Sequence, residues 1–456
     1  MVSRAAAREK ISSAFDPFLN ESGPNDKRDA IVIYQAPLLD RVPEQSSLRR
    51  RGARMRYVEE RAAIQKLVQE RLFESYLEAG SKKMAKGVDL DVAAIGSSAL
   101  PVATMEVTRR TLPALAQDPD VIAVLPNQRI NLIAPKEIDY IGLNKRQTQR
   151  GVTWGLECLD IPKLWARTRG QDINVAVLDT GVYGEHPALA GRVKEFVVID
   201  PLGHRITADR TFDSGQHGTH VCGTIAGSET PEGVAIGVAP ECNLLVGGVL
   251  VGDATVRTLM EGLSWAVEKG ADIVNMSLGF PYYEPKFTEV LKILIEQFGI
   301  LPVVAVGNDS HGNSCSPGNA YSAFSVGAVV KGLRGKLDVA SFSSGASLVF
   351  PGEEPNALVT KPDVVAPGVE IYSCIPPEKR PSGSYEYTFM DGTSMAAPHV
   401  AGAAALLMAA APQAPVNDII RALKETAEHP RGAERRPDNR WGYGLIQPVE
   451  ALKALE

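Results

Sequence analysis

The sequence of 456 residues contains few cysteines, little net charge and no long apolar run. Its five cysteines are an odd number at wide spacings, with no C-x-x-C pair, which argues against a disulfide framework or a zinc site. The formal net charge of -6 gives no support to a general nucleic-acid-binding role. No apolar run reaches the roughly 18 residues that a membrane span needs.

The N-terminus begins with basic residues, MVSRAAAREKISSAFDPF, but lacks the apolar core of a secretory signal. Together with the unpaired thiols, this predicts a cytoplasmic protein, or a secreted one if a signal is missing from the given sequence. What is present is an ordinary globular composition of 44% hydrophobic and 22% charged residues, with enough length for two or three domains.

The first part of the chain divides into two segments. Residues 1–30 are polar and carry clustered turn formers, so we expect a flexible N-terminal tail. Residues 31–133 contain apolar runs and helical spacings in the order strand, helix, strand, helix, strand, which is typical of a small α+β domain. The strands are expected near 30–34, 90–95 and 121–125, and the helices at 47–80 and 104–117.

Two polar stretches carry predictions of their own. Residues 134–152 lack sustained periodicity and are predicted to be a linker that holds a processing site. The run Arg49-Arg50-Arg51 is predicted to be the solvated face of a helix, with an anionic partner or a processing site as alternatives.

Residues 153–456 have a different pattern. Near-continuous apolar, β-branched runs alternate with helical segments, which indicates an α/β domain built on a doubly wound parallel sheet with helices on both faces. The runs are 174–179, 243–251, 272–279, 301–308 and 322–330. Ligands of such sheets bind at the carboxyl ends of the strands, so polar residues there are candidates for chemistry.

Four polar residues of this domain fit one reaction. Asp179 ends the first strand, Asn308 follows a later one, and His217 and Ser394 each stand at the start of an apolar helical stretch. A serine hydroxyl becomes a nucleophile when an imidazole takes its proton, and a buried carboxylate orients that imidazole. A helix N-terminus and an asparagine amide can stabilise the oxyanion.

Each of these residues also has a structural interpretation. Asp179 and Asn308 could be turn residues, His217 a helix cap or core histidine, and Ser394 an N-cap. All four at strand ends and helix starts of one domain favour the catalytic interpretation.

Three blocks carry a family resemblance. VAVLDTGV (175–182), HGTHVCGTIAG (217–227) and GTSMAAPHVAG (392–402) resemble the signature blocks of the subtilisin-like serine proteases, in that family's order. The resemblance implies a serine endopeptidase that cleaves polypeptide substrates through an acyl-enzyme, with Asp179, His217 and Ser394 as catalytic triad and Asn308 as oxyanion donor. It also implies a primary specificity pocket lined by Ser277, Leu278, Gly279, Ala305, Val306 and Gly307.

The N-terminal segment is similar to a second part of that family. PVATMEVTRRTLPALAQDPDVIAVLPNQRINL (101–132) resembles the inhibitory propeptide. The resemblance implies that residues 31–133 are an intramolecular inhibitor whose C-terminal end lies through the active site as a product would. It implies a zymogen that cuts itself between about 132 and 152. The alternative is a permanently attached regulatory or partner-binding domain.

No metal or cofactor is assigned. The family often places an acidic calcium ligand near position 188, where Ala188 cannot ligate, and GSETPEG (227–233) lacks an asparagine-rich calcium loop. Hard oxygen ligands elsewhere in the chain could still bind calcium.

Two rival functions remain. One is a catalytically silent binding module, and the other is a sensor whose residues 1–150 stay bound until a partner releases them.

Overall fold

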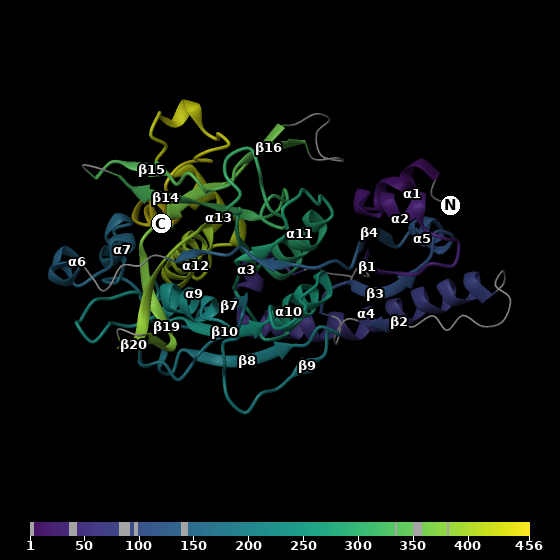
Figure 1. Ribbon diagram of the computed structural model, residues 1–456, viewed down its shortest axis with the longest axis horizontal. Helices are drawn as coiled ribbons and strands as arrows, with labels where there is room; N and C mark the ends of the chain where they lie inside the picture. The colour runs from purple at the N-terminus through teal and green to yellow at the C-terminus, as the bar shows by residue number, and fades with distance from the viewer. Residues whose placement is uncertain are drawn as a thin grey trace.

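The computed structural model describes residues 4–35, 43–81, 92–94, 99–137, 145–332, 335–349, 358–380 and 383–456. Part of the predicted linker, residues 138–144, and the ends of the predicted strand at 90–95 lie outside the described residues. Figure 1 shows most of the N-terminal elements on one side of the molecule and the large domain, formed by residues 153–456, on the other.

The N-terminal domain is an antiparallel sheet in the order β2-β3-β1-β4. Its strands and following helix are β1 (Arg28–Tyr34), β2 (Val92–Ala94), β3 (Val102–Val107), α5 (Thr111–Ala116) and β4 (Val121–Pro126). Alternate residues of β1 face opposite sides: Ala30 and Val32 pack with α5, and Ile31 and Ile33 pack with helices of the large domain. The helix predicted at 104–117 is wrong in its first half, because residues 102–107 pair with β1 as a strand.

The structure contradicts the flexible tail predicted for residues 1–30. This stretch contains α1 (Arg4–Lys10), η1 (Ser13–Phe15), α2 (Asp16–Glu21) and the start of β1. Ala7, Ile11, Phe15 and Phe18 recur every three or four residues, and all four are buried against the sheet and α5. The polar composition concealed this apolar stripe.

The predicted helix at 47–80 is observed as two helices. These are α3 (Gln45–Leu48) and the long α4 (Arg51–Ser81), which Figure 1 shows running from the large domain out along the N-terminal sheet. The buried side chains of α4 include the polar Arg54, Arg61 and Gln65.

The large domain confirms the predicted doubly wound α/β fold. Its nine-stranded sheet has the order β15-β14-β13-β11-β7-β10-β8-β9, with β18 beside β14. The central strands pair in parallel, and β9 and β15 close the sheet as antiparallel edges. The strands are β7 (Asn174–Asp179), β8 (Val193–Ile199), β9 (Arg205–Ile206), β10 (Asn243–Gly248), β11 (Ile273–Met276), β13 (Leu301–Ala305), β14 (Phe324–Lys331), β15 (Leu337–Val339) and β18 (Val364–Pro367).

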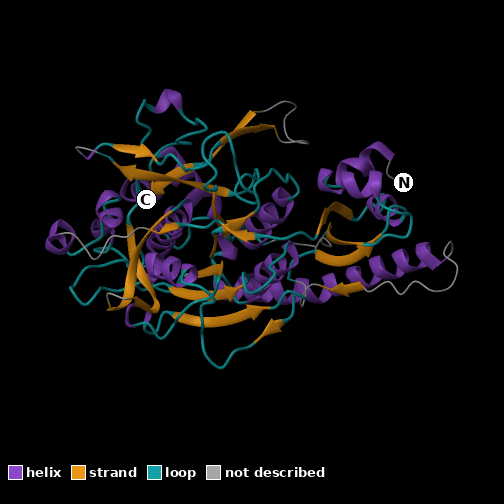
Figure 2. Ribbon diagram, viewed as in Figure 1, coloured by secondary structure: helices purple, strands orange, loops and turns teal. Residues whose placement is uncertain are grey.

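Helices cover both faces of this sheet (Figure 2). On β7, Val175 and Val177 point to a core shared with α9 (His217–Ala226) and α12 (Thr393–Ala410). Ala176 and Leu178 point to a core shared with α10 (Val256–Glu268) and α11 (Phe287–Phe298). Both faces of the strand are therefore apolar, as a buried parallel strand requires.

The remaining elements are short or peripheral. They are β5 (Asn131–Leu132), β6 (Lys136–Glu137), α6 (Lys145–Arg150), α7 (Trp154–Cys158), α8 (Ile161–Leu164), η2 (Pro187–Leu189), β12 (Leu278–Gly279), β16 (Ala346–Val349), β17 (Leu358–Lys361), β19 (Ile371–Arg380), β20 (Gly383–Asp391), α13 (Val416–Glu425), η4 (Ala433–Arg435) and α14 (Pro448–Leu455). Within the described part of the chain, α12 alone has the length and hydropathy of a membrane span, and 89% of it is buried in the domain core.

Candidate active site

Asp179 and His217 form a buried, hydrogen-bonded pair. Asp179 is the last residue of β7 and His217 the first of α9, so the carboxyl end of the central strand faces a helix N-terminus. The carboxylate Oδ1 accepts a hydrogen bond from His217 Nδ1 at 2.8 Å and one from the Thr180 N–H at 2.7 Å. Because Nδ1 donates, the other ring nitrogen, Nε2, is left as the proton acceptor of a neutral imidazole.

Asp213, which sequence analysis missed, fixes the start of α9. Its Oδ2 accepts hydrogen bonds from the backbone and hydroxyl of Thr219, at 2.8 and 2.6 Å. Its Oδ1 accepts from the hydroxyl of Thr180 at 2.7 Å, and that hydroxyl oxygen accepts in turn from Gly218 N–H at 2.9 Å. An acidic residue four positions before His217 and next to a helix N-terminus was the available signal.

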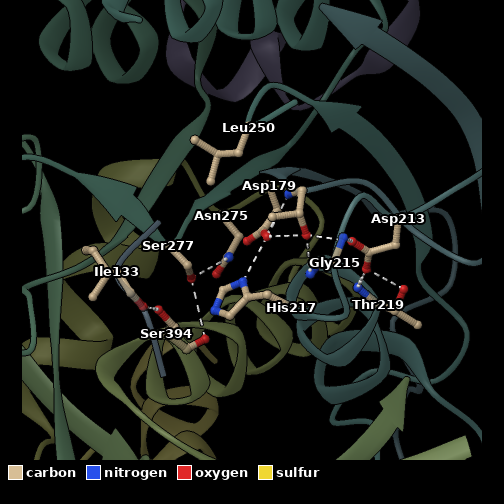
Figure 3. Close-up of polar contacts among 12 residues, drawn as sticks. Ile133, Asp179, Asp213, Gly215, His217, Thr219, Leu250, Asn275, Ser277 and Ser394 are labelled. Atoms are coloured by element: carbon tan, nitrogen blue, oxygen red, sulfur yellow. Dashed lines mark hydrogen bonds and ion pairs between the residues drawn. The ribbon is translucent and has the colours of Figure 1, made fainter. Parts of the chain in front are cut away.

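Ser394 is the second residue of α12 and is fully buried. Its hydroxyl does not cap the helix but donates to the carbonyl oxygen of Ile133 at 2.9 Å. Figure 3 shows the imidazole of His217 between Asp179 and Ser394. The N-cap interpretation of Ser394 therefore fails, and the three predicted triad residues gather at one place.

Asn308 lies three residues after the end of β13, and its side chain is oriented by Thr393, the residue before Ser394. Its Oδ1 accepts hydrogen bonds from the backbone N–H and the hydroxyl of Thr393, both at 2.9 Å. These two bonds turn the amide Nδ2 outward, where it donates to the Ala134 carbonyl at 3.0 Å. The preceding Gly307 has φ of +118°, and a Cβ there would lie 2.6 Å from Cys315 Sγ, so only glycine fits.

An extended stretch of the chain itself fills the cleft beside these residues. We call residues 127–137 the cleft segment. Its β5 pairs antiparallel with β12, matching Leu132 with Leu278 and Asn131 with Gly279, and Ile133 N–H donates to Ser277 O at 3.2 Å. Beyond the serine, β6 pairs with β20.

Two side chains of the cleft segment are buried. Ile133 is 7% exposed and packs in the core shared with α9 and α12, whereas Ile130 is 3% exposed and packs in the core shared with α10. Ile130 N–H donates to the Ala254 carbonyl at 3.1 Å.

The six predicted pocket residues divide into two sets. Ser277, Leu278 and Gly279 contact the cleft segment through the backbone. Ala305 ends β13, and Val306 and Gly307 follow it and lead into Asn308. Their place at the strand end is as predicted, and their part in side-chain selection stays a prediction.

The other two histidines of the signature blocks bond to backbone carbonyls. His220 Nε2 lies 3.0 Å from Ile371 O, and His399 Nδ1 lies 2.8 Å from Met395 O. Burial lowers the pKa of His220 to about 3 and that of His399 to about 4, so both are neutral at ordinary pH.

Among the described residues, no group of three or more His, Cys, Asp and Glu side chains could hold a metal ion. The buried Ala188 offers no ligand at the position where the family often has one. The absence of a metal or cofactor stays a prediction.

Comparison with known proteins identifies relatives of this chain. The subtilase family model matches residues 170–444. An intracellular serine protease of Paenibacillus polymyxa is 35% identical over 280 residues, which are 59% of this chain and 77% of that protein. An alkaline protease of Alkalihalobacillus alcalophilus is 32% identical over 359 residues, 78% of this chain and 80% of that protein.

A solved structure resembles the whole chain. Fervidolysin from Fervidobacterium pennivorans, described as a keratinolytic enzyme related to subtilisin, matches with a TM-score of 0.68 and 25% identity. The match covers 95% of this chain and 62% of fervidolysin. The chain belongs to the subtilase family. It is a serine-type endopeptidase, and the relatives that it matches are named serine proteases.

Proposed function

We propose that Asp179, His217 and Ser394 are the catalytic triad of this endopeptidase and that Asn308 is a donor of its oxyanion hole. One observation carries the proposal: a carboxylate-bound imidazole stands next to a serine whose hydroxyl touches a peptide carbonyl, at 2.9 Å, in an extended chain. A protease binds its substrate as an extended strand beside a strand of its own, and here β12 pairs with the extended cleft segment in this way.

The reaction follows from the hydrogen bonds. Asp179 fixes the proton on His217 Nδ1, so Nε2 takes the proton of Ser394 Oγ as that oxygen attacks the substrate carbonyl carbon. The carbonyl oxygen becomes an oxyanion, which the Asn308 amide stabilises. Imidazolium then gives its proton to the leaving amine as the C–N bond breaks, leaving an acyl-serine that water hydrolyses by the same steps.

The first test compares two buried serines. Ser394→Ala should abolish casein hydrolysis, because it removes the nucleophile. Ser325→Ala is the matched control, since Ser325 is equally buried and its hydroxyl has no hydrogen-bond partner in the described chain. Hydrolysis by Ser394→Ala at the rate of the control would reject the triad, and two inactive variants beside an active wild type would indicate misfolding. A catalytically silent binding module would show no hydrolysis with any variant, including wild type.

We further propose that the N-terminal domain inhibits the enzyme through the cleft segment. The nucleophile and the oxyanion donor meet successive carbonyls, Ser394 at Ile133 and Asn308 at Ala134. Among the described residues, no single peptide bond is held by both groups, and efficient hydrolysis needs both on one carbonyl, because loss of an oxyanion donor alone costs about 10²- to 10³-fold in kcat. In this arrangement the segment therefore occupies the site without being aligned for cleavage, and self-processing would require a shift that brings one carbonyl to both groups.

Self-processing between about 132 and 152 stays part of the proposal. The peptide bonds beside the serine are Ile133–Ala134 and Ala134–Pro135. Mass spectrometry of purified wild type beside Ser394→Ala would locate any cut. A chain that stays whole in both, and inactive on casein until a partner is added, would favour the sensor with a permanently attached domain.

For substrates, we propose extended polypeptides with an apolar residue at the cleavage position. Ile133 and Ile130 support this choice, because both are buried where a substrate would place side chains. We propose the cytoplasm as the location, supported by five free cysteines.

A further inference from the structure

A fully buried lysine lies in the large domain, outside the active site. Lys361 is the last residue of β17, and its side chain is 1% exposed. Lysine is almost never buried to this extent unless its charge is paired. Its Nζ donates to three oxygens, the carbonyls of Tyr321 and Ala323 at 3.2 and 2.8 Å and Asp363 Oδ2 at 2.8 Å. We call these three oxygens the cage.

The cage requires a charged lysine. Burial raises the pKa of Asp363, but the ammonium groups of Lys361 and Lys424 outweigh burial and lower it to about 2, so the carboxylate is ionised. A carboxylate and two carbonyls can only accept hydrogen bonds, and together they need three N–H donors on one nitrogen. The ammonium form of lysine has three such donors, and the neutral amine has fewer. Although burial lowers the pKa of Lys361, the cage therefore holds it as a cation.

Asp363 binds a second cation through its other oxygen. Lys424 Nζ, in α13, lies 2.9 Å from Asp363 Oδ1 and 4.7 Å from the centre of the Tyr443 ring. Asp363 and Lys424 together carry no net charge, so the only net charge at the cage is that of its occupant. A doubly charged occupant would double the net charge buried here, which is costly away from water. The surroundings therefore favour a single positive charge in the cage.

A cavity of about 220 Å³ adjoins the cage. Tyr321, Ala323 and Asp363 line this cavity on the side of the cage. Two further polar side chains, Glu296 and Asn417, line it as well. A polar cavity of this size has room for water, so an ion in the cage could complete its coordination with water molecules on this side.

The cage joins elements that lead toward the catalytic serine. Its carbonyls come from the turn before β14, its carboxylate comes directly before β18, and these two strands pair in the sheet. β18 leads to Gly368, whose carbonyl accepts from the Gly392 N–H at 2.8 Å, two residues before Ser394. An occupied cage therefore fixes the start of the strand that supports this end of the site.

We propose that the cage is a site for a monovalent cation and that the Lys361 ammonium is its built-in occupant. Carbonyl oxygens can replace the water shell of K⁺ in proteins. The Nζ–O separations of 2.8 to 3.2 Å exceed the roughly 2.3–2.6 Å of Ca²⁺–oxygen bonds. They suit K⁺, whose radius is close to that of ammonium. Because the lysine supplies the charge covalently, the stability of this part of the enzyme does not depend on an ion from solution.

The test empties the cage and offers ions in place of the lysine. Lys361→Ala is made in the full chain with Ser394→Ala, so that no self-digestion occurs. Its thermal midpoint should fall by about 5–10 °C, because the buried carboxylate and carbonyls lose a partner. K⁺ or NH₄⁺, as chloride, should restore about half of that loss or more, with a midpoint that rises with the logarithm of ion concentration. Tetramethylammonium at equal ionic strength is too large for the cage and should restore nothing.

Three control chains in the same background separate the cage from general salt effects. Lys361→Met removes the ammonium but fills its space with an apolar side chain, so its midpoint should fall and no ion should restore it. Lys453→Ala removes a lysine of α14 whose side chain is 63% exposed. That variant and the parent chain should respond to K⁺ no more than to tetramethylammonium.

Several results would overturn the proposal. One is a Lys361→Ala chain that responds equally to K⁺, NH₄⁺ and tetramethylammonium, or that stays unfolded at every K⁺ concentration. Another is an equal K⁺-specific rise in Lys361→Met or in the parent chain, which would place the ion elsewhere. A response of Lys361→Ala to Ca²⁺ alone would reject a site of ammonium size. None of these results bears on the triad, because the nucleophile is absent from every chain compared.

Discussion

Replacing Asp213 by asparagine tests whether this residue positions the catalytic histidine. The carboxylate accepts four hydrogen bonds, two on each oxygen, from Thr180, Gly215 and Thr219. In Asp213→Asn one of the two carboxylate oxygens is replaced by an NH2 group. Each oxygen accepts from one backbone N–H, Oδ1 from Gly215 and Oδ2 from Thr219, so the NH2 group faces a donor in whichever position it takes. At least one N–H loses its acceptor, at a cost of about 1–3 kcal/mol, and the remaining bonds lose their charge.

The catalytic consequence follows from where the donors lie. Thr219 is in the first turn of α9, and Thr180 follows Asp179, so loosening either moves His217 relative to Asp179. Small displacements of catalytic groups are costly, and we expect kcat to fall about 10-fold or more with little change in KM.

The assay is steady-state hydrolysis of a peptide substrate, with thermal unfolding measured in parallel. Asp209→Asn is the control, because Asp209 is an exposed carboxylate in the same loop. Equal kcat and thermal midpoints in the two variants would refute the positioning role. A lower midpoint with unchanged kcat would make Asp213 purely structural.

Three further predictions concern the oxyanion, pH and metals. Asn308→Ala should lower kcat by about 10²- to 10³-fold, the loss that the same change causes in subtilisin, and unchanged turnover would remove Asn308 from the oxyanion hole. Glu284 is buried under Ser12 of the N-terminal domain, and burial raises its pKa above 4.5. Because undocking would expose Glu284 and lower its pKa, docking takes up a proton and should weaken as the pH rises from 4.5 through the raised value. The dissociation constant of the two pieces of a Ser394→Ala chain cut between Glu137 and Lys145, determined at several pH values, measures this, and Glu284→Gln should remove the dependence. Dialysis against a chelator should leave activity and thermal midpoint unchanged, and a loss that calcium restores would reveal an unassigned site.

The architecture of the large domain was predictable because its strands are buried on both faces. Continuous apolar runs ending in Asp179 or leading to Asn308 show both the sheet and its ligand-binding edge. The signature blocks then identified the order of the polar residues. These features are local, and each can be seen within about a dozen consecutive residues.

The parts that sequence analysis missed depend on distant contacts. Ile11 and Phe15 are separated by polar residues, and their common face appears only against β4 and α5. The solvated face predicted for Arg49-Arg50-Arg51 is wrong for Arg49, whose side chain is 3% exposed and lies 3.5 Å from Asp272 Oδ1. Asp213 has the same character, because its four hydrogen-bond donors come from the residue after β7, the loop before α9 and the first turn of α9.

The most direct test of the triad is covalent labelling with a fluorophosphonate, followed by peptide mapping. The account predicts a single adduct on Ser394 that forms after the cleft segment is displaced, for example in Ile133→Asp, and that disappears in His217→Ala. An adduct on another serine, or undiminished labelling of Ser394 without His217, would contradict it.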